Sequence, residues 1–292
     1  MRPTARCEPA PAGGAARCGC GGFTLVESVM VIAITGVLAA VVSLFIVQPV
    51  QAYLATSARA GLVDQADLAL RRIGRDLRLA LPNSTRVSAS GLSLELIPTQ
   101  GGARYATEGA GQLEFGTLDT SFAVLGPPLV LGTAQQLVFY NLGPGVVGSD
   151  AYAPNTSATE QASSNRRTAS NGAGAASTIT LNSLAALPVA DKAAPYRVLA
   201  VGEPVSYRCD LAAGTLTRYS GYGFLATQPD PPSGGLAALL ASGVTACRFG
   251  ADGTLVAARA ALVSLSLTLA ANTGSGNEAI TLHHAVYVDN LP

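Results

Sequence analysis

The stretch that decides the fold begins with Gly21-Gly22-Phe23-Thr24-Leu25-Val26-Glu27 and continues as SVMVIAITGVLAAVVSLFIV over residues 28–47. A run of about 20 apolar residues spans about 30 Å as a helix, which matches the hydrocarbon core of a bilayer. No charged residue occurs between Glu27 and Arg59. The sequence therefore predicts a membrane-spanning helix at 28–47.

Charges ahead of this run indicate its orientation. Arg2, Arg6 and Arg17 precede it, with Glu8 as the acidic residue of the segment. The excess of positive charge predicts a cytoplasmic amino end and an exported remainder. An ordinary secretory signal is the alternative, and the sequence QPVQA at 48–52 is a weak candidate for its cleavage site.

Glu27 lies at the edge of the apolar run, where an unpaired carboxylate is costly in lipid, so a functional partner is expected. The string GFTLVE at 22–27, followed directly by the apolar run, resembles the signature of type IV prepilins, which include pilins and type II secretion pseudopilins. In that family a prepilin peptidase cuts after the glycine and methylates the new amino group. The resemblance implies removal of residues 1–22 as a cytoplasmic leader, cleavage between Gly22 and Phe23, and N-methylation of Phe23.

Cleavage at that bond leaves a cationic amino group on Phe23. In a filament of staggered helices, Glu27 of one subunit can neutralise this amine on its neighbour, whereas a mismatched register leaves both charges unpaired in low dielectric. We therefore expect Glu27 to set the register of assembly. A glutamate that only reaches the lipid headgroups is the alternative.

Apolar residues at helical spacing continue beyond the membrane run and predict one helix over 23–81, whose later part packs on a globular head. They are Leu62, Ala66, Ala69, Ile73, Leu77 and Ala80. The sequence Pro82-Asn83-Ser84 should end the helix.

Residues 82–292 are predicted to form a β-rich globular head, periplasmic or extracellular, which makes the fold class α+β and pilin-like. Alternating apolar and polar residues predict strands at 92–97, 136–140, 178–181, 197–201, 244–249, 264–269 and 285–288, and a hairpin at 204–210 and 215–219. The segment 143–176 is rich in small polar residues and is predicted to be a long mobile loop.

The five cysteines fall into two groups. Cys7, Cys18 and Cys20 precede the apolar run, and the pair at 18 and 20 is a poor metal site without neighbouring ligands. Cys209 and Cys247 lie on predicted strands of the exported part, where a disulfide is expected. Two buried free thiols are the alternative.

The remaining composition argues against catalysis and nucleic-acid binding. The chain has 18 basic and 18 acidic residues, a net charge of zero, and lacks a basic block for phosphates. His283 and His284 are neighbours in a predicted strand and point to opposite faces. Without a phosphate loop or a nucleophile motif, we predict no enzyme activity, no cofactor and no metal site.

Two further strings narrow the resemblance. LRRIGRDLR at 70–78, running into ALPNSTRV at 80–87, and the closing LHHAVYVDNLP at 282–292 are similar to MshO-type minor pilins of mannose-sensitive haemagglutinin (MSHA) pilus biogenesis. This resemblance implies a minor pilin that primes assembly of a type IV pilus and sits at or near its tip. Its partners would be the prepilin peptidase, other minor and major pilins, and the inner-membrane assembly platform.

The implied location is a single pass of the inner membrane with the head in the periplasm, and later the filament on the cell surface. Two alternatives remain open. One is a J-type minor pseudopilin of a type II secretion system, which shares the amino end and a large β-rich head. The other is an exported binding protein held by an uncleaved signal anchor.

Overall fold

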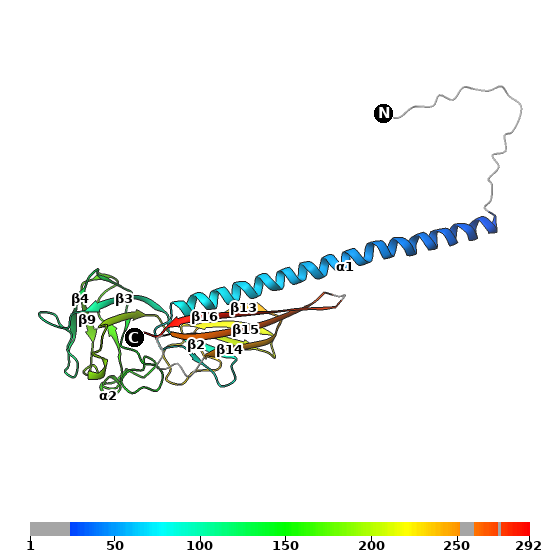
Figure 1. Cartoon of the computed structure of the whole chain (residues 1–292). Helices are drawn as coiled ribbons and strands as arrows, with labels where there is room; N and C mark the ends of the chain where they lie inside the picture. Colours follow the sequence, from blue (N-terminus) through cyan, green and yellow to red (C-terminus); the bar gives the residue numbers. More distant parts are fainter. Residues whose placement is uncertain (1–23, 252–259, 274–275) are drawn as a thin grey trace, which may run out of the picture. The chain divides into compact units, whose positions relative to one another are not determined.

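The computed structural model describes residues 24–251, 260–273 and 276–292. The chain divides into two compact units, Met1–Tyr53 and Leu54–Pro292. Helix α1 (Leu25–Arg78) begins in the first unit and ends in the second, and nearly all regular structure after it is β-strand (Figure 1). The predicted α+β class, a long apolar amino-terminal helix followed by a β-rich globular domain, is confirmed.

The part of α1 that belongs to the second unit buries one face. Its buried residues include every apolar position predicted up to Leu77, and Ala80 is also buried. The helix ends at Arg78, three residues before the predicted end, because the following residues bond to the chain around residue 98. The carbonyl of Leu79 accepts from Thr99 N at 2.7 Å, and Leu81 N donates to the carbonyl of Ile97 at 2.7 Å.

Two antiparallel sheets share a hydrophobic core with α1. The first is five-stranded in the order β1-β2-β11-β12-β13, and the second is three-stranded in the order β14-β15-β16. The strands of the first are β1 (Arg86–Val87), β2 (Ser93–Leu96), β11 (Val205–Asp210), β12 (Thr215–Ser220) and β13 (Leu236–Ser242). Those of the second are β14 (Val244–Ala251), β15 (Ala260–Asn272) and β16 (Asn277–Asp289).

Helix α1 and strand β16 lie side by side and run in the same direction (Figure 1). Near the start of β16, Arg59 Nη2 is 2.6 Å from Glu278 Oε2. Further along, Gly74 faces His284, and a Cβ on this glycine would lie 3.1 Å from His284 Nε2. Just beyond both elements, the side-chain amide of Asn83 donates to the carbonyl of Asn290 at 3.1 Å.

A closed barrel with the order β10-β3-β4-β9-β7-β6 forms a second core. Its strands are β3 (Thr99–Tyr105), β4 (Ser121–Leu125), β6 (Gln136–Phe139), β7 (Arg166–Ala169), β9 (Thr178–Asn182) and β10 (Arg197–Val201). A two-stranded sheet of β5 (Leu129–Leu131) and β8 (Gly174–Ala176), helix α2 (Ala158–Gln161) and a 3-10 turn (Val189–Asp191) complete this region. Tyr105 stands at the centre of the barrel core, with the rings of Phe115, Phe122 and Phe139 at 5.7–6.3 Å.

The prediction of a long loop at 143–176 is wrong, because the segment contributes α2, β7 and β8. Although the segment is rich in small polar residues, part of it is buried. Arg167 is fully buried in β7, and its guanidinium donates to backbone carbonyls rather than to water. Polar residues that bond to buried backbone groups in this way carry no apolar alternation, so the strand pattern is absent from the sequence.

Candidate functional site

The amino-terminal turn of α1 holds the carboxylate singled out from the sequence. Thr24 precedes the helix, and its Oγ1 accepts a hydrogen bond from Glu27 N at 3.2 Å. Thr24 is therefore the N-cap and Glu27 is the third helical residue, where the partial positive charge of the helix end favours a carboxylate. This capping role of Thr24 was not predicted, although the spacing Thr24-x-x-Glu27 is typical of a capping box.

The side chain of Glu27 is exposed, and within residues 24–251, 260–273 and 276–292 it has no ion pair or hydrogen bond. Gly22 and Phe23, the residues of the predicted cleavage and methylation, lie outside the described residues. So do Cys7, Cys18 and Cys20. The free carboxylate leaves Glu27 available to a group from outside the first unit.

Apolar side chains surround the helix after Glu27. All residues from 24 to 54 are exposed, including the large side chains of Leu25, Val31, Leu38 and Phe45. By length and composition α1 qualifies as a membrane span. The Thr35 hydroxyl, a polar group within the span, donates to the carbonyl of Val31 at 2.6 Å and needs no external partner. The helix thus fits a single-pass anchor, and the hydroxyl of Thr35 is satisfied within it.

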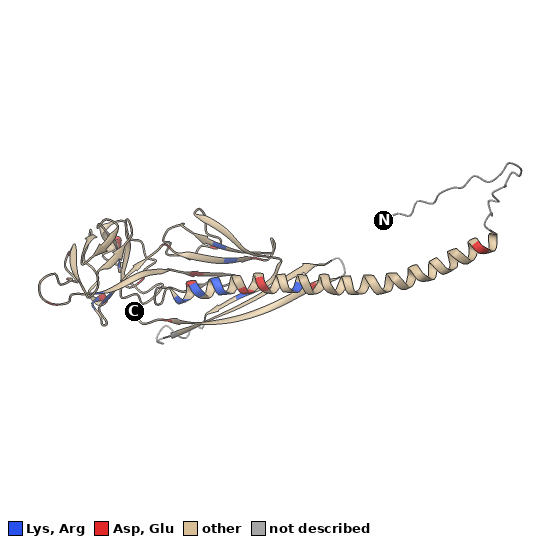
Figure 2. Cartoon of the chain, turned by 90° about the horizontal axis from the view of Figure 1, so that it is seen from above, with Lys and Arg blue, Asp and Glu red and all other residues tan. Residues whose placement is uncertain are grey.

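Most charged residues of α1 lie in its carboxyl-terminal part (Figure 2). There Asp76 joins the helix to the five-stranded sheet. The hydroxyl of Tyr207 on β11 donates to Asp76 Oδ2 at 2.5 Å, and Arg218 Nε on β12 is 3.1 Å from the same oxygen. Burial, then the hydrogen bond to Asp76, raises the pKa of Tyr207, so its hydroxyl keeps the proton that it donates.

A second polar cluster is formed by Glu95, Arg86 and Tyr222. Glu95 on β2 is fully buried, and Arg86 Nε is 2.5 Å from its Oε2. Tyr222 donates to the other oxygen, Oε1, at 2.7 Å. The Arg86 guanidinium also stacks on the ring of Tyr152, 3.7 Å from its centroid. The buried carboxylate is thus compensated by a cation and a hydroxyl, which is the arrangement that burial of a charge requires.

Asn83, within the predicted helix stop at 82–84, ties three segments together. Its side-chain amide donates to the carbonyls of Asn141 at 2.9 Å and Asn290 at 3.1 Å. Asn83 has a φ of 60°, a left-handed conformation that asparagine tolerates better than most residues. Arg197 Nη2 holds the carbonyls of Leu291 at 2.8 Å and Pro292 at 3.0 Å. The last residues of the chain are therefore fixed where the helix enters the head.

The barrel contains a buried carboxyl that has one hydrogen bond. Ser149 Oγ donates to Asp191 Oδ1 at 2.6 Å, while Oδ2 has no partner among the described residues. Burial raises the pKa of Asp191 to about 7, against the lowering effects of Ser149 and Arg167. Burial also lowers the pKa of Arg167 to about 10. Arg167 still carries its charge at neutral pH, and Asp191 titrates there.

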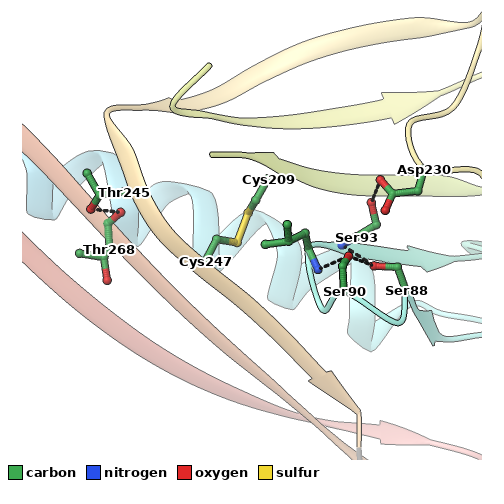
Figure 3. The surroundings of a disulfide bond; sticks show 9 residues. Ser88, Ser90, Ser93, Cys209, Asp230, Thr245, Cys247 and Thr268 are labelled. Atoms are coloured by element: carbon green, nitrogen blue, oxygen red, sulfur yellow. Dashed lines mark hydrogen bonds between the residues drawn. A yellow bond between two sulfur atoms is a disulfide. The ribbon is translucent and has the colours of Figure 1, made fainter. Parts of the chain in front are cut away.

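A disulfide links Cys209 on β11 to Cys247 on β14, with the Cα atoms 6.3 Å apart (Figure 3). The bond therefore joins the five-stranded sheet to the three-stranded sheet, and Cys209 belongs to the core that both share with α1. Near it, Ser93 Oγ on β2 donates to Asp230 at 2.8 Å. The pair Cys209 and Cys247 is bonded in the structure, which therefore does not contain the alternative of two free thiols.

The adjacent histidines occupy β16 with different exposure. His283 is exposed, while His284 is half-buried against α1 at Gly74. Over the residues that the structure describes, His, Cys, Asp and Glu side chains form no group that could hold a metal ion. The described residues therefore offer an exposed apolar helix with Glu27 in its first turn, followed by a β-rich domain.

Comparison with known proteins bears on the amino-terminal segment. Residues 17–43 match the family model of the prokaryotic N-terminal methylation motif, which is that of type IV prepilin-like chains. The match supports a type IV pilin-like protein. Its range includes Gly22, Phe23 and Glu27, and it implies processing by a prepilin peptidase and assembly with other pilins. No curated protein and no solved structure matches this chain.

Proposed function

We propose that this chain is a minor pilin that primes assembly of a type IV, MSHA-like pilus and sits at or near its tip. The observation that carries the proposal is the exposed part of α1 at residues 28–54, which has no charged residue and follows Glu27 within the matched methylation motif. A helix of this kind can leave the bilayer only by packing against similar helices, since its apolar surface is unfavourable in water.

In this proposal residues 1–22 are removed by the prepilin peptidase, and Phe23 becomes the methylated amino terminus. Glu27 pairs with that amine on a neighbouring subunit and sets the register. The chain first crosses the inner membrane once with its head in the periplasm, where the assembly platform and other minor and major pilins engage it. It then enters the filament on the cell surface.

The size of the head supports a minor rather than a major subunit, because two β cores follow the helix. A J-type minor pseudopilin of a type II secretion system shares the same features and is the second candidate. Deletion of the gene separates the two: loss of surface filaments supports the pilus, and loss of exported enzymes with filaments intact supports secretion.

The first experiment is the intact mass and amino-terminal sequence of the chain purified from membranes that contain the prepilin peptidase. A chain that begins at methylated Phe23 is expected. A chain that still carries Gly22 would overturn the proposal and leave a signal-anchored exported domain. A peptidase-deficient strain provides the matched control, since there the chain should retain its leader.

A further inference from the structure

A groove of about 640 Å³ lies between the carboxyl-terminal part of α1 and strand β16. From the helix, Asp67, Arg71, Arg75 and Arg78 line it, and from the strand His283 and His284 do so. Guanidinium groups from the helix and imidazoles from the strand therefore line the groove.

Helical spacing brings the three arginines to one face, because they follow one another four and three residues apart. Gly74 lies between them, and a Cβ there would come within 3.1 Å of His284 Nε2. The absence of a side chain at Gly74 lets His284 approach the helix, so that the imidazole forms part of the groove rather than being displaced from it.

The groove carries an excess of positive charge. Arg71 is paired with Asp67, its Nε 2.7 Å from Oδ2, whereas Arg75 and Arg78 are exposed and have no ion pair or hydrogen bond within the described parts of the chain. Three arginines against one aspartate leave a surplus of two positive charges.

Helix stability does not account for this arrangement. Like charges four or three residues apart destabilise a helix by about 0.2–0.5 kcal/mol per pair. The helix dipole favours a basic residue in the last turn, but it does not require three on the face that borders a groove. Guanidinium groups held side by side are suited to carboxylates, which they bind with two parallel hydrogen bonds.

We propose that this groove docks an acidic segment, one that carries Asp or Glu side chains, of a neighbouring subunit. The proposal rests on the proposed function, in which the head meets other pilin-like subunits. The occupant is inferred from charge complementarity. Arg75 and Arg78 offer two unpaired cations, and the one aspartate that lines the groove, Asp67, is paired with Arg71, so no unpaired carboxylate among the lining residues would repel an acidic segment.

The test places a photo-crosslinking amino acid, benzoylphenylalanine, at the exposed position His283 of the full chain, in cells that hold its own assembly genes. Illumination should link it to a subunit through a peptide with more than one Asp or Glu, identified by mass spectrometry. The yield should fall at least about fivefold in Arg75→Glu/Arg78→Glu, as loss of charge-assisted contacts would give. The milder Arg75→Gln/Arg78→Gln should give an intermediate loss.

The matched control is Arg104→Glu, a charge reversal at an exposed arginine of the barrel strand β3, which should leave the crosslink unchanged. An intact Cys209–Cys247 disulfide shows that each variant has folded. The proposal is overturned if the crosslink withstands the double reversal, or reaches an uncharged or basic peptide or a lipid. Absence of any crosslink also overturns it.

The crosslink is read in both the membrane fraction and the sheared filament fraction, which separates this proposal from the proposed function. A chain that retains its leader and never enters filaments contradicts the proposed function, whatever the crosslink shows. A processed chain that enters filaments without the charge-dependent crosslink contradicts the groove alone.

Discussion

The hydroxyl of Tyr207 donates a 2.5 Å hydrogen bond to Oδ2 of Asp76, across a separation of 131 residues. This contact joins β11 to the last turns of α1, and Arg218 reinforces it from β12. It is the polar counterpart of the apolar packing between the helix and the five-stranded sheet, and it fixes the rotation of the helix on that sheet.

Removing this contact should destabilise the head. Tyr207→Phe leaves the half-buried carboxylate of Asp76 without one donor, and a hydrogen bond to a charged group contributes about 1.5–3 kcal/mol. Urea unfolding of the full chain in detergent, followed by near-ultraviolet circular dichroism, should show a lower midpoint. Tyr287→Phe, at an exposed tyrosine of β16, is the control. Equal midpoints for the two variants would contradict a structural role for the contact.

The disulfide should contribute to stability through the loop that it closes. Its cysteines are 38 residues apart, and such a bridge stabilises by about 2–4 kcal/mol. Cys209→Ala/Cys247→Ala should therefore unfold at a lower temperature than the wild type. A reducing agent should lower the unfolding temperature of the wild type to that of the variant and leave that of the variant unchanged. A wild type that is insensitive to reduction, with two thiols that react with maleimide on unfolding, would show that the bond is absent in solution.

Asp191 should make stability fall as pH rises. Its folded pKa of about 7 lies above the ordinary value, so the folded state holds a proton that the unfolded state releases between pH about 4 and 7. Asp191→Asn removes this penalty and keeps an acceptor for Ser149. The free energy of unfolding of the variant should equal that of the wild type near pH 4. At pH 8 it should be higher by up to about 4 kcal/mol, since each unit of pKa shift corresponds to about 1.4 kcal/mol.

Thermal unfolding at a series of pH values measures this difference. Asp64→Asn, on the exposed face of α1, should not reproduce the pH-dependent gain. If the advantage of Asp191→Asn is the same at pH 4 and pH 8, the buried carboxyl does not titrate in this range.

The charge on Glu27 should matter for assembly more than its place in the helix cap. Glu27→Gln keeps a hydrogen-bonding side chain in the first turn but removes the charge that would meet the amine of a neighbouring Phe23. We expect normal leader cleavage and membrane insertion with loss of at least about tenfold from the filament fraction, which corresponds to about 1.4 kcal/mol per contact. Ser28→Ala, one residue further along, should assemble normally. Normal incorporation of Glu27→Gln would exclude the charge pair.

The helix and its buried face could be predicted because they depend on local periodicity. The spacing of Leu62, Ile73 and Leu77 identifies the face that packs on the sheets. The hairpin of β11 and β12 and the disulfide could also be predicted, since Val205, Tyr207 and Cys209 alternate with other residues and two cysteines follow the apolar run.

Three strands of the barrel, β6, β9 and β10, lie where the alternation predicts them, whereas β3, β4 and β7 and the closure of the barrel were not predicted. Strand β3 contains Gly101 and Gly102, which obscure the alternation. Strand β7 places Arg166 and Arg167 in the interior, where backbone carbonyls rather than a carboxylate compensate them. The hydrogen bonds of Tyr207 to Asp76 and of Tyr222 to Glu95 join residues 131 and 127 positions apart, so no local sequence pattern predicts them.

The parallel course of α1 and β16 has a mechanical consequence. The helix meets the strand at Arg59–Glu278 and at Gly74–His284, and the residues just beyond the two elements are joined at Asn83–Asn290. A pull along the helix axis loads these attachments together in shear, instead of breaking them one after another as peeling would. The head is thus coupled to its helix in the geometry that resists tension.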